Sequence, residues 1–102
     1  MTKVLVARPG EGASFQQMPN ELNELVGGSV QCVQLEHNYI LYCNHEGNVL
    51  DLPANPYFAR GIVKGNFVIS KTDQNGNNLG LDADDYAFVM KTYIQNQHVN
   101  VK

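Results

Sequence analysis

The sequence predicts a small α+β domain with a mixed or antiparallel sheet of about five strands, a central hairpin, one short helix after the second strand and one C-terminal helix. Runs of β-branched and aliphatic residues broken by glycine and proline indicate the strands. Two stretches with apolar residues three and four apart, each preceded by a capping residue, indicate the helices. Since the chain has 102 residues, 43% of them hydrophobic, we predict one domain over residues 1–96 and a frayed tail over residues 97–102.

Glycine and proline residues mark the ends of the first predicted strands and of the first helix. Residues 3–8 are aliphatic on both faces and end at Pro9-Gly10, which predicts a buried strand. Residues 13–18 are expected to return beside it. A helix of about two turns should follow, with Asn20 as its N-cap and Gly27 as its stop. Its buried stripe is predicted to be Leu22, Leu25 and Val26.

Residues 29–36 and 39–44 predict a hairpin with a two-residue turn at His37-Asn38, in which Asn38 takes a positive φ. Counting from that turn places Val33 opposite Tyr42 and Cys32 opposite Cys43. Both faces are then apolar, so we expect the hairpin to be central in its sheet, with helices on one face and a second subunit as one candidate cover for the other.

The two cysteines allow a functional and a purely structural interpretation. Facing each other, Cys32 and Cys43 could form a disulfide or share a soft metal, but buried reduced thiols that act as small hydrophobes are favoured. A zinc site needs four ligands, and the neighbouring histidines do not supply the required spacing. We predict no metal and no cofactor.

The second half begins with a turn at Asn44-His45-Glu46-Gly47, where Asn44 should cap the loop and Gly47 should take a positive φ. Residues 49–52 predict a short strand, and residues 53–61, with two prolines, predict a loop held by aromatic anchors. Residues 62–71 predict a strand interrupted at Gly65-Asn66 by a bulge or a close backbone approach.

Residues 72–80 are polar and predict a turn region. Asp82 is the predicted N-cap of the last helix, with Asp84 and Asp85 in its first turn. Its apolar side is predicted to consist of Ala87, Val89, Met90, Tyr93 and Ile94.

Charge and hydropathy exclude several classes of function. The net charge of −3, without any run of lysine or arginine, argues against direct nucleic-acid binding, and the acidic residues are too dispersed to mimic DNA. No apolar stretch is long enough to cross a membrane. The apolar run after Met1 is also too short for a secretory signal, so we expect a cytoplasmic protein.

Motifs for catalysis are missing from the sequence. It contains no Gly-x-Ser-x-Gly elbow, Walker A loop or dinucleotide fingerprint. The carboxylates Asp82, Asp84 and Asp85 are explained by helix capping, and Glu46 and Asp51 by solvation of a turn. We therefore expect a protein that is not an enzyme.

The remaining polar and aromatic residues predict a surface for a ligand or partner. The predicted binding residues are Asn44, Glu46, Asn55, Tyr57 and Arg60, with His45 and Phe58 beside them. Aromatic rings can stack on a base, arginine can pair with a phosphate or carboxylate, and asparagine can read a polar edge. Alternatively, Tyr57 and Phe58 simply anchor their loop in the core.

A family resemblance adds to this reading. The order and spacing of several short segments resemble a family of small proteins classed as a domain of unknown function. These segments are Lys3-Val4-Leu5-Val6 with Pro9-Gly10, Leu25-Val26-Gly27-Gly28, Asn44-His45-Glu46-Gly47 and Leu52-Pro53. That family occurs in phages, prophages and other mobile elements, mainly of Firmicutes. The resemblance covers roughly residues 3–90. In the family a polar or basic residue usually follows Leu-Pro-x-Asn, whereas here Pro56 follows Asn55 and the nearby base is Arg60.

The small size, mild acidity and doubly apolar hairpin of the chain, together with the habitat of the family, lead us to expect one of two functions. The first is a non-enzymatic accessory protein of a phage or mobile element that binds a host protein and modulates it, in an anti-defence role. The alternative is a small-molecule or nucleotide-binding protein that sequesters its ligand at a loop or subunit interface, near residues 55–61. In both cases we expect a homo-oligomer.

Overall fold

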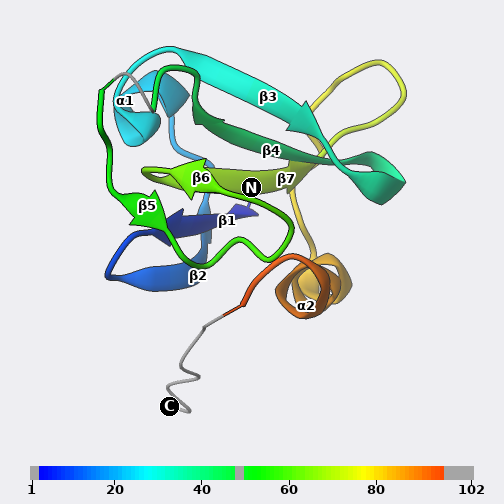
Figure 1. The fold of residues 1–102 in the computed structure, drawn as a ribbon. Coiled ribbons are helices and arrows are strands. Elements are labelled where there is room, and N and C mark those ends of the chain that lie inside the picture. The colour runs from blue at the N-terminus through cyan, green and yellow to red at the C-terminus, as the bar shows by residue number, and fades with distance from the viewer. Residues whose placement is uncertain (1–2, 48–49, 96–102) are drawn as a thin grey trace.

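The fold is described from a computed structural model, which places residues 3–47 and 50–95 (Figure 1). Its elements are β1 (Lys3–Arg8), β2 (Gly12–Gln17), α1 (Leu22–Val26), β3 (Val30–Gln34), the 3-10 turn η1 (Glu36–Asn38), β4 (Tyr39–Asn44), β5 (Ala54–Asn55), β6 (Val63–Lys64), β7 (Phe67–Lys71) and α2 (Ala83–Thr92).

Five strands form one antiparallel sheet in the order β2-β1-β7-β4-β3, and β5 pairs with β6 in a second, smaller sheet. The predicted α+β fold with a five-stranded antiparallel sheet is therefore confirmed. Alternate residues of β1 enter two separate cores, because successive side chains of a strand point to opposite faces. Leu5 and Ala7 lie in the larger core with α2, and Val4 and Val6 lie in the smaller core, against which α1 packs.

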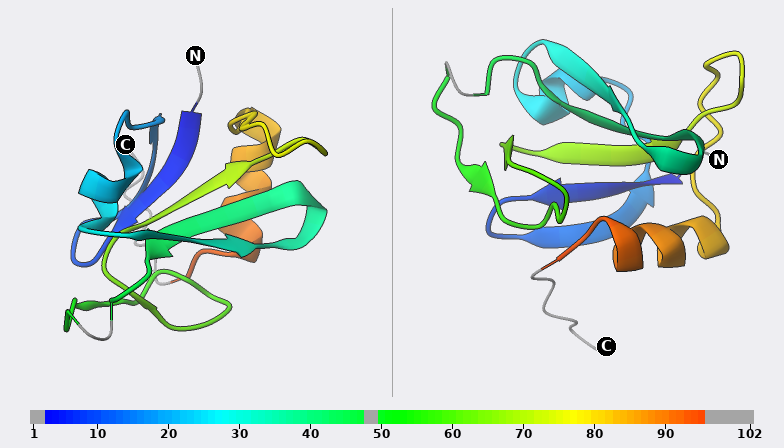
Figure 2. Two further views of the ribbon diagram at one scale, coloured as in Figure 1. Left: turned by 90° about the horizontal axis from the view of Figure 1, so that it is seen from above. Right: turned by 45° about the vertical axis from the view of Figure 1, so that its right-hand side comes forward.

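The two helices therefore cover opposite faces of the sheet, as Figure 2 shows. This corrects the expectation that both would lie on one face with a second subunit over the other. The larger core is rich in aromatic side chains: Phe15 of β2 contacts Tyr86, and Tyr39 of β4 stacks on Phe88 with ring centroids 5.4 Å apart.

Helix α1 begins one residue later than its predicted cap implies. Glu21 is the N-cap, without a side-chain capping bond, so Asn20 does not cap the helix. The predicted glycine stop is confirmed, because Gly27 adopts a left-handed conformation with φ 83° and its N–H donates to the Asn23 carbonyl.

The hairpin register differs by one residue from the prediction. Val33 lies opposite Leu41, and Cys32 lies opposite Tyr42. A three-residue turn, η1, replaces the predicted two-residue turn, with Asn38 at a positive φ as expected and His37 also positive. Leu35 packs on the same core as Tyr39 and Leu41 of β4, which requires this register, because a shift of one residue would turn Leu35 to the other face.

This register separates the cysteines. Cys32 is exposed and shares a face with Tyr42, whereas Cys43 is buried and points to the opposite face, into the core with α2. The predicted contact between the two thiols is therefore wrong. The central position of the hairpin holds only for β4, since β3 is the edge strand of the sheet.

The segment after β4 contains less strand than predicted. Leu50 and Asp51 lie in a turn closed by the Leu50 N–H on the Glu46 carbonyl, and Asp51 has φ 54°, so no strand forms there. Val49, which was included in that strand, lies outside the described residues.

The predicted interruption of residues 62–71 is confirmed, but the two pieces belong to different sheets. At the break, Gly65 has φ 84° and would place a Cβ 2.9 Å from Cδ1 of Leu52, so the close backbone approach is real.

Helix α2 has the predicted N-cap. Asp82 accepts from the Asp85 N–H at 2.9 Å and Asp85 accepts in return from the Asp82 N–H at 3.1 Å, which completes a capping box. Val89 and the following Tyr93 and Ile94 are buried, whereas Ala87 is exposed. Neither this helix nor α1 is long and apolar enough to cross a membrane, within the described part of the chain.

Candidate functional site

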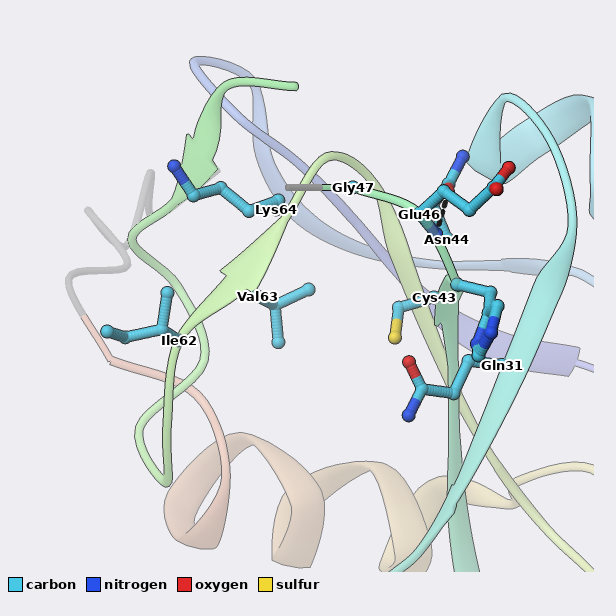
Figure 3. Close-up of a pocket in the computed structure, with 9 residues that line it drawn as sticks. Gln31, Cys43, Asn44, Glu46, Gly47, Ile62, Val63 and Lys64 are labelled. Carbon is cyan, nitrogen blue, oxygen red and sulfur yellow. Dashed lines mark hydrogen bonds between the residues drawn. The ribbon is translucent and has the colours of Figure 1, made fainter. Parts of the chain in front are cut away.

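A pocket of about 280 Å³ opens where the end of β4 meets β6 (Figure 3). One wall is formed by the end of β4, the turn after it and Gln31 of the edge strand, and the other by residues 62–64. The pocket is lined by Gln31, Cys43, Asn44, His45, Glu46, Gly47, Ile62, Val63 and Lys64. It therefore includes two of the predicted binding residues, Asn44 and Glu46, together with His45.

Asn44 positions the turn that forms one wall. Its side chain is buried, donates from Nδ2 to the Val26 carbonyl at 2.9 Å and accepts at Oδ1 from the Glu46 N–H at 2.6 Å. The predicted loop cap is therefore confirmed. Because these bonds hold the turn against the end of α1, Asn44 fixes the shape of this pocket wall. The exposed Glu46 gives the wall a negative charge.

Gly47 lets the two walls touch. A Cβ on this residue would lie 2.8 Å from Cβ of Lys64 and 3.2 Å from its carbonyl oxygen. Its φ is not in the left-handed region, so the predicted reason for this glycine is wrong and the close packing on β6 is the actual reason.

The pocket floor is apolar and its rim is charged. Val63 and Cys43 are buried at the floor, and Glu46 and Lys64 lie on opposite walls (Figure 3). Burial raises the pKa of the Cys43 thiol, and the neighbouring Cys32 raises it further. The thiol is therefore kept neutral, which is the unreactive form of cysteine.

Ile62 is the most unusual residue of this site. It is a β-branched aliphatic residue, yet 88% of its surface is exposed, the largest fraction among the large hydrophobic residues described. Val33, 37% exposed, lies on the same sheet face as Gln31, because residues two apart on a strand share a face. Exposed apolar side chains thus border the pocket.

Asn55, by contrast, does not line the pocket, although it pairs with Val63 of β6. Its Nδ2 donates to the carbonyls of Ala7 at 3.1 Å and Gly65 at 2.9 Å, and its Oδ1 accepts from the Tyr57 N–H at 3.1 Å. With 4% of its surface exposed, this amide joins β5 to β1 and to the corner at Gly65. The side chain has a structural role in the fold.

The aromatic loop is anchored in the core. Phe58 is buried against Phe67 and Tyr93, with ring centroids 5.6 and 6.5 Å away, and Tyr57 packs on the same core. Arg60 lies over the Tyr93 ring at 5.4 Å, with its Nη1 3.8 Å from Oε1 of Glu36. The structure therefore groups Asn55, Tyr57 and Arg60 apart from Asn44 and Glu46.

A second polar cluster joins the sheet to α2. The Tyr39 hydroxyl donates to Oδ1 of Asp85 at 2.8 Å, and Nζ of Lys71 lies 3.1 Å from the same oxygen. Burial and the Asp85 carboxylate raise the pKa of Tyr39 to about 12. Burial alone would raise the pKa of Asp85, but hydrogen bonds from the Asp82 N–H, Tyr39 and Lys71 outweigh it and lower that pKa.

Sequence reasoning missed the β6 wall. It assigned Ile62, Val63 and Lys64 to an ordinary strand, although the break at Gly65-Asn66 was a signal that this segment leaves the main sheet. Within residues 3–47 and 50–95, no three His, Cys, Asp or Glu side chains are grouped so that they could hold a metal ion.

Comparison with known proteins gives a family and no function. Residues 1–97 match the family described as a domain of unknown function, DUF3846, and the chain belongs to that family. No curated protein and no solved structure matches the chain.

Proposed function

We propose that this DUF3846 protein is a non-enzymatic accessory protein of a phage or mobile element, which binds a host protein in the host cytoplasm and modulates its activity. Its purpose would be to counter a host defence. The origin in a mobile element is supported by the family resemblance of its Val-Gly-Gly, Asn-x-Glu-Gly and Leu-Pro segments.

The observation that carries the proposal is Ile62 at the rim of the β4–β6 pocket. Contiguous apolar patches rimmed by polar groups are typical of protein-binding surfaces, whereas single exposed apolar residues are common on any surface. Ile62 supports the proposal through its place at the rim of a pocket. Ile62 is 88% exposed beside a pocket that carries Glu46 on one wall and Lys64 on the other. The partner segment should therefore present an apolar side chain flanked by charges of both signs.

The charge of the pocket favours a protein segment over a nucleotide. Its volume of about 280 Å³ is close to the lower end of the roughly 300–1,000 Å³ that small organic ligands occupy, so volume does not separate the two. The pocket holds one acidic and one basic side chain, Glu46 and Lys64, so a phosphate group would meet repulsion as well as attraction. A protein segment with charges of both signs suits this pocket better.

The absence of catalysis in this proposal is supported by the state of the nucleophile in the pocket. The buried Cys43 has a raised pKa and stays a neutral thiol.

The test is an affinity purification of tagged protein from host extract, followed by native mass spectrometry. We expect a host protein to co-purify with the unmodified chain and with Leu79→Asp, a matched change at another exposed aliphatic residue. Ile62→Asp should reduce recovery at least tenfold, because a buried carboxylate at the contact would lack a partner.

Two results would contradict the proposal. Equal recovery with Ile62→Asp and the unmodified chain would remove the pocket rim from the interface. A small molecule bound at fixed stoichiometry, lost in Arg60→Ala, would instead support the sequestering alternative at residues 55–61.

A further inference from the structure

The outer edge of β3 is a bare strand edge. Within the described residues β3 pairs only with β4, and four of its five residues are exposed. Its sequence, Val-Gln-Cys-Val-Gln, has no charge, proline or glycine. Proteins normally protect an edge from pairing with another chain by such charges, prolines or bulges. None of these protections is present within β3.

The backbone of β3 alternates in a way that can be read from the hairpin. Leu35 donates its N–H to the Tyr39 carbonyl, and the Ser29 carbonyl accepts from the His45 N–H. In an antiparallel pair the hydrogen-bonded residues alternate along the strand. Residues 29, 31, 33 and 35 therefore direct their backbone groups to β4, and Val30, Cys32 and Gln34 direct theirs outward.

This outward set is symmetric about Cys32. If a second β3 runs antiparallel along the edge, Cys32 lies opposite its own copy and Val30 lies opposite Gln34. Each of these pairs then matches an outward N–H with an outward carbonyl, which makes three pairs of reciprocal hydrogen bonds. The three outward residues, Val30, Cys32 and Gln34, then all have their backbone groups paired across the contact.

We propose that two copies of this chain associate through the outer edge of β3, with Cys32 on the two-fold axis. An isologous contact requires a surface that is complementary to itself, and a neutral strand with this spacing meets that requirement. Any charge near the axis would oppose its own copy, and β3 carries none. The contact would also cover part of Val33, which is 37% exposed in the single chain.

The dimer would leave both β4–β6 pockets open. Gln31, which lines the pocket, would lie beside Val33 of the second copy on the same sheet face, since paired residues share a face. The two pockets would then open on one face of a continuous sheet. The association does not depend on any host partner, so it is tested independently of the proposed function.

The first test is cross-linking of the purified full chain with a short bifunctional methanethiosulfonate. The Cβ atoms of facing residues lie about 5 Å apart, beyond the roughly 3.8 Å of a relaxed disulfide, so a short spacer suits this pair. We expect a cross-linked dimer from the unmodified chain and from Cys43→Ser, and none from Cys32→Ser. Cys43 is the matched control because it is buried.

The second test is the oligomeric state over a dilution series by analytical ultracentrifugation. We expect a dimer that dissociates on dilution. Cys32→Asp should abolish it while the far-UV spectrum is kept, because two carboxylates would face each other across the axis at an exposed position. A monomer at every concentration, or a dimer that survives Cys32→Asp, would overturn the proposal.

A third measurement needs no variant. Amide hydrogen exchange by NMR at high protein concentration should show protection of Val30, Cys32 and Gln34, as well as of the residues bonded to β4. On dilution, only the outward three should lose their protection. Rapid exchange of these three amides at all concentrations would mean that the edge stays open to water.

Discussion

At the residue scale, Asn55 shows how a polar residue that resembles a binding group can serve the fold. Asn55→Ala would leave the carbonyls of Ala7 and Gly65 and the Tyr57 N–H without the partner that they now share. Each buried polar group left unsatisfied costs about 1–3 kcal/mol. With three such groups, we expect the free energy of unfolding to fall by about 3 kcal/mol or more.

Chemical denaturation measures this loss, and Asn20→Ala at an exposed position is the control, expected to change stability by less than about 0.5 kcal/mol. If Asn55→Ala is fully stable but fails to bind the partner, Asn55 belongs to the binding site and the structural role assigned here is wrong.

Tyr39 is expected to make the stability of the protein depend on pH in the alkaline range. Its folded pKa is about 12, against 10.0 for the ordinary phenol. The neutral phenol is thus favoured in the folded state, and its contribution is complete below pH 10 and is lost as the pH rises toward 12. We expect the free energy of unfolding to decline by about 2 kcal/mol over this range from Tyr39 alone.

The measurement is urea denaturation at several alkaline pH values, compared with Tyr39→Phe. The variant should lack this part of the decline and should differ at pH 7 by about 1 kcal/mol, the value of one hydrogen bond. An identical decline in both proteins would show that folding does not raise the pKa of Tyr39.

At the element scale, the turn at residues 44–47 and the short strand β6 depend on each other through Gly47. In Gly47→Ala the new Cβ would lie 2.8 Å from Cβ of Lys64, so one wall of the pocket has to move. We expect a loss of about 1–3 kcal/mol and a weaker host contact. Gly61→Ala is the control in both thermal unfolding and pull-down, because its nearest neighbour would lie at 3.9 Å. Equal effects of the two substitutions would show that the walls do not need this contact.

The elements that could be predicted from sequence were those with local causes. Gly27 ends α1 and Asp82 caps α2 because their backbone and side-chain preferences act within one turn. The hairpin register could not be predicted by counting, since it depends on Leu35 reaching the same core as Leu41 across the sheet. For the same reason, the sequence could not show that Cys32 and Cys43 lie on opposite faces of the sheet.

The candidate site was predictable in half. The Asn44 to Gly47 turn was recognised from its own residues, and the Asn44 side chain caps it as expected. The opposite wall depends on β6 leaving the main sheet, which is decided by the approach of Gly65 to Leu52. The Gly65-Asn66 break indicated an interruption, but no local pattern shows that the residues before it join a different sheet.

At the scale of the whole molecule, the two helices cover opposite faces, so the sheet can grow only at its edge strands, β2 and β3 (Figures 1 and 2). The contact proposed above uses β3. If the sheet grows by a second copy at this edge, the molecule presents two pockets on one face. A host target with two equivalent sites would then be held more tightly than one pocket alone allows, because the second contact forms within the same complex.

The strand β7 joins two hairpins that do not otherwise pair. It lies between β1 and β4, so the β1–β2 and β3–β4 hairpins share a sheet only through it. During translation both hairpins leave the ribosome before β7 does. Until then the face of β1 that carries Leu5 and Ala7, which is fully covered in the finished fold, lacks the side chains of β7 and α2. The nascent chain thus exposes apolar surface and is prone to aggregate at this stage. Its folding should be slow for its size, because the β1–β7 pairing joins residues far apart in the sequence, such as Leu5 and Ile69.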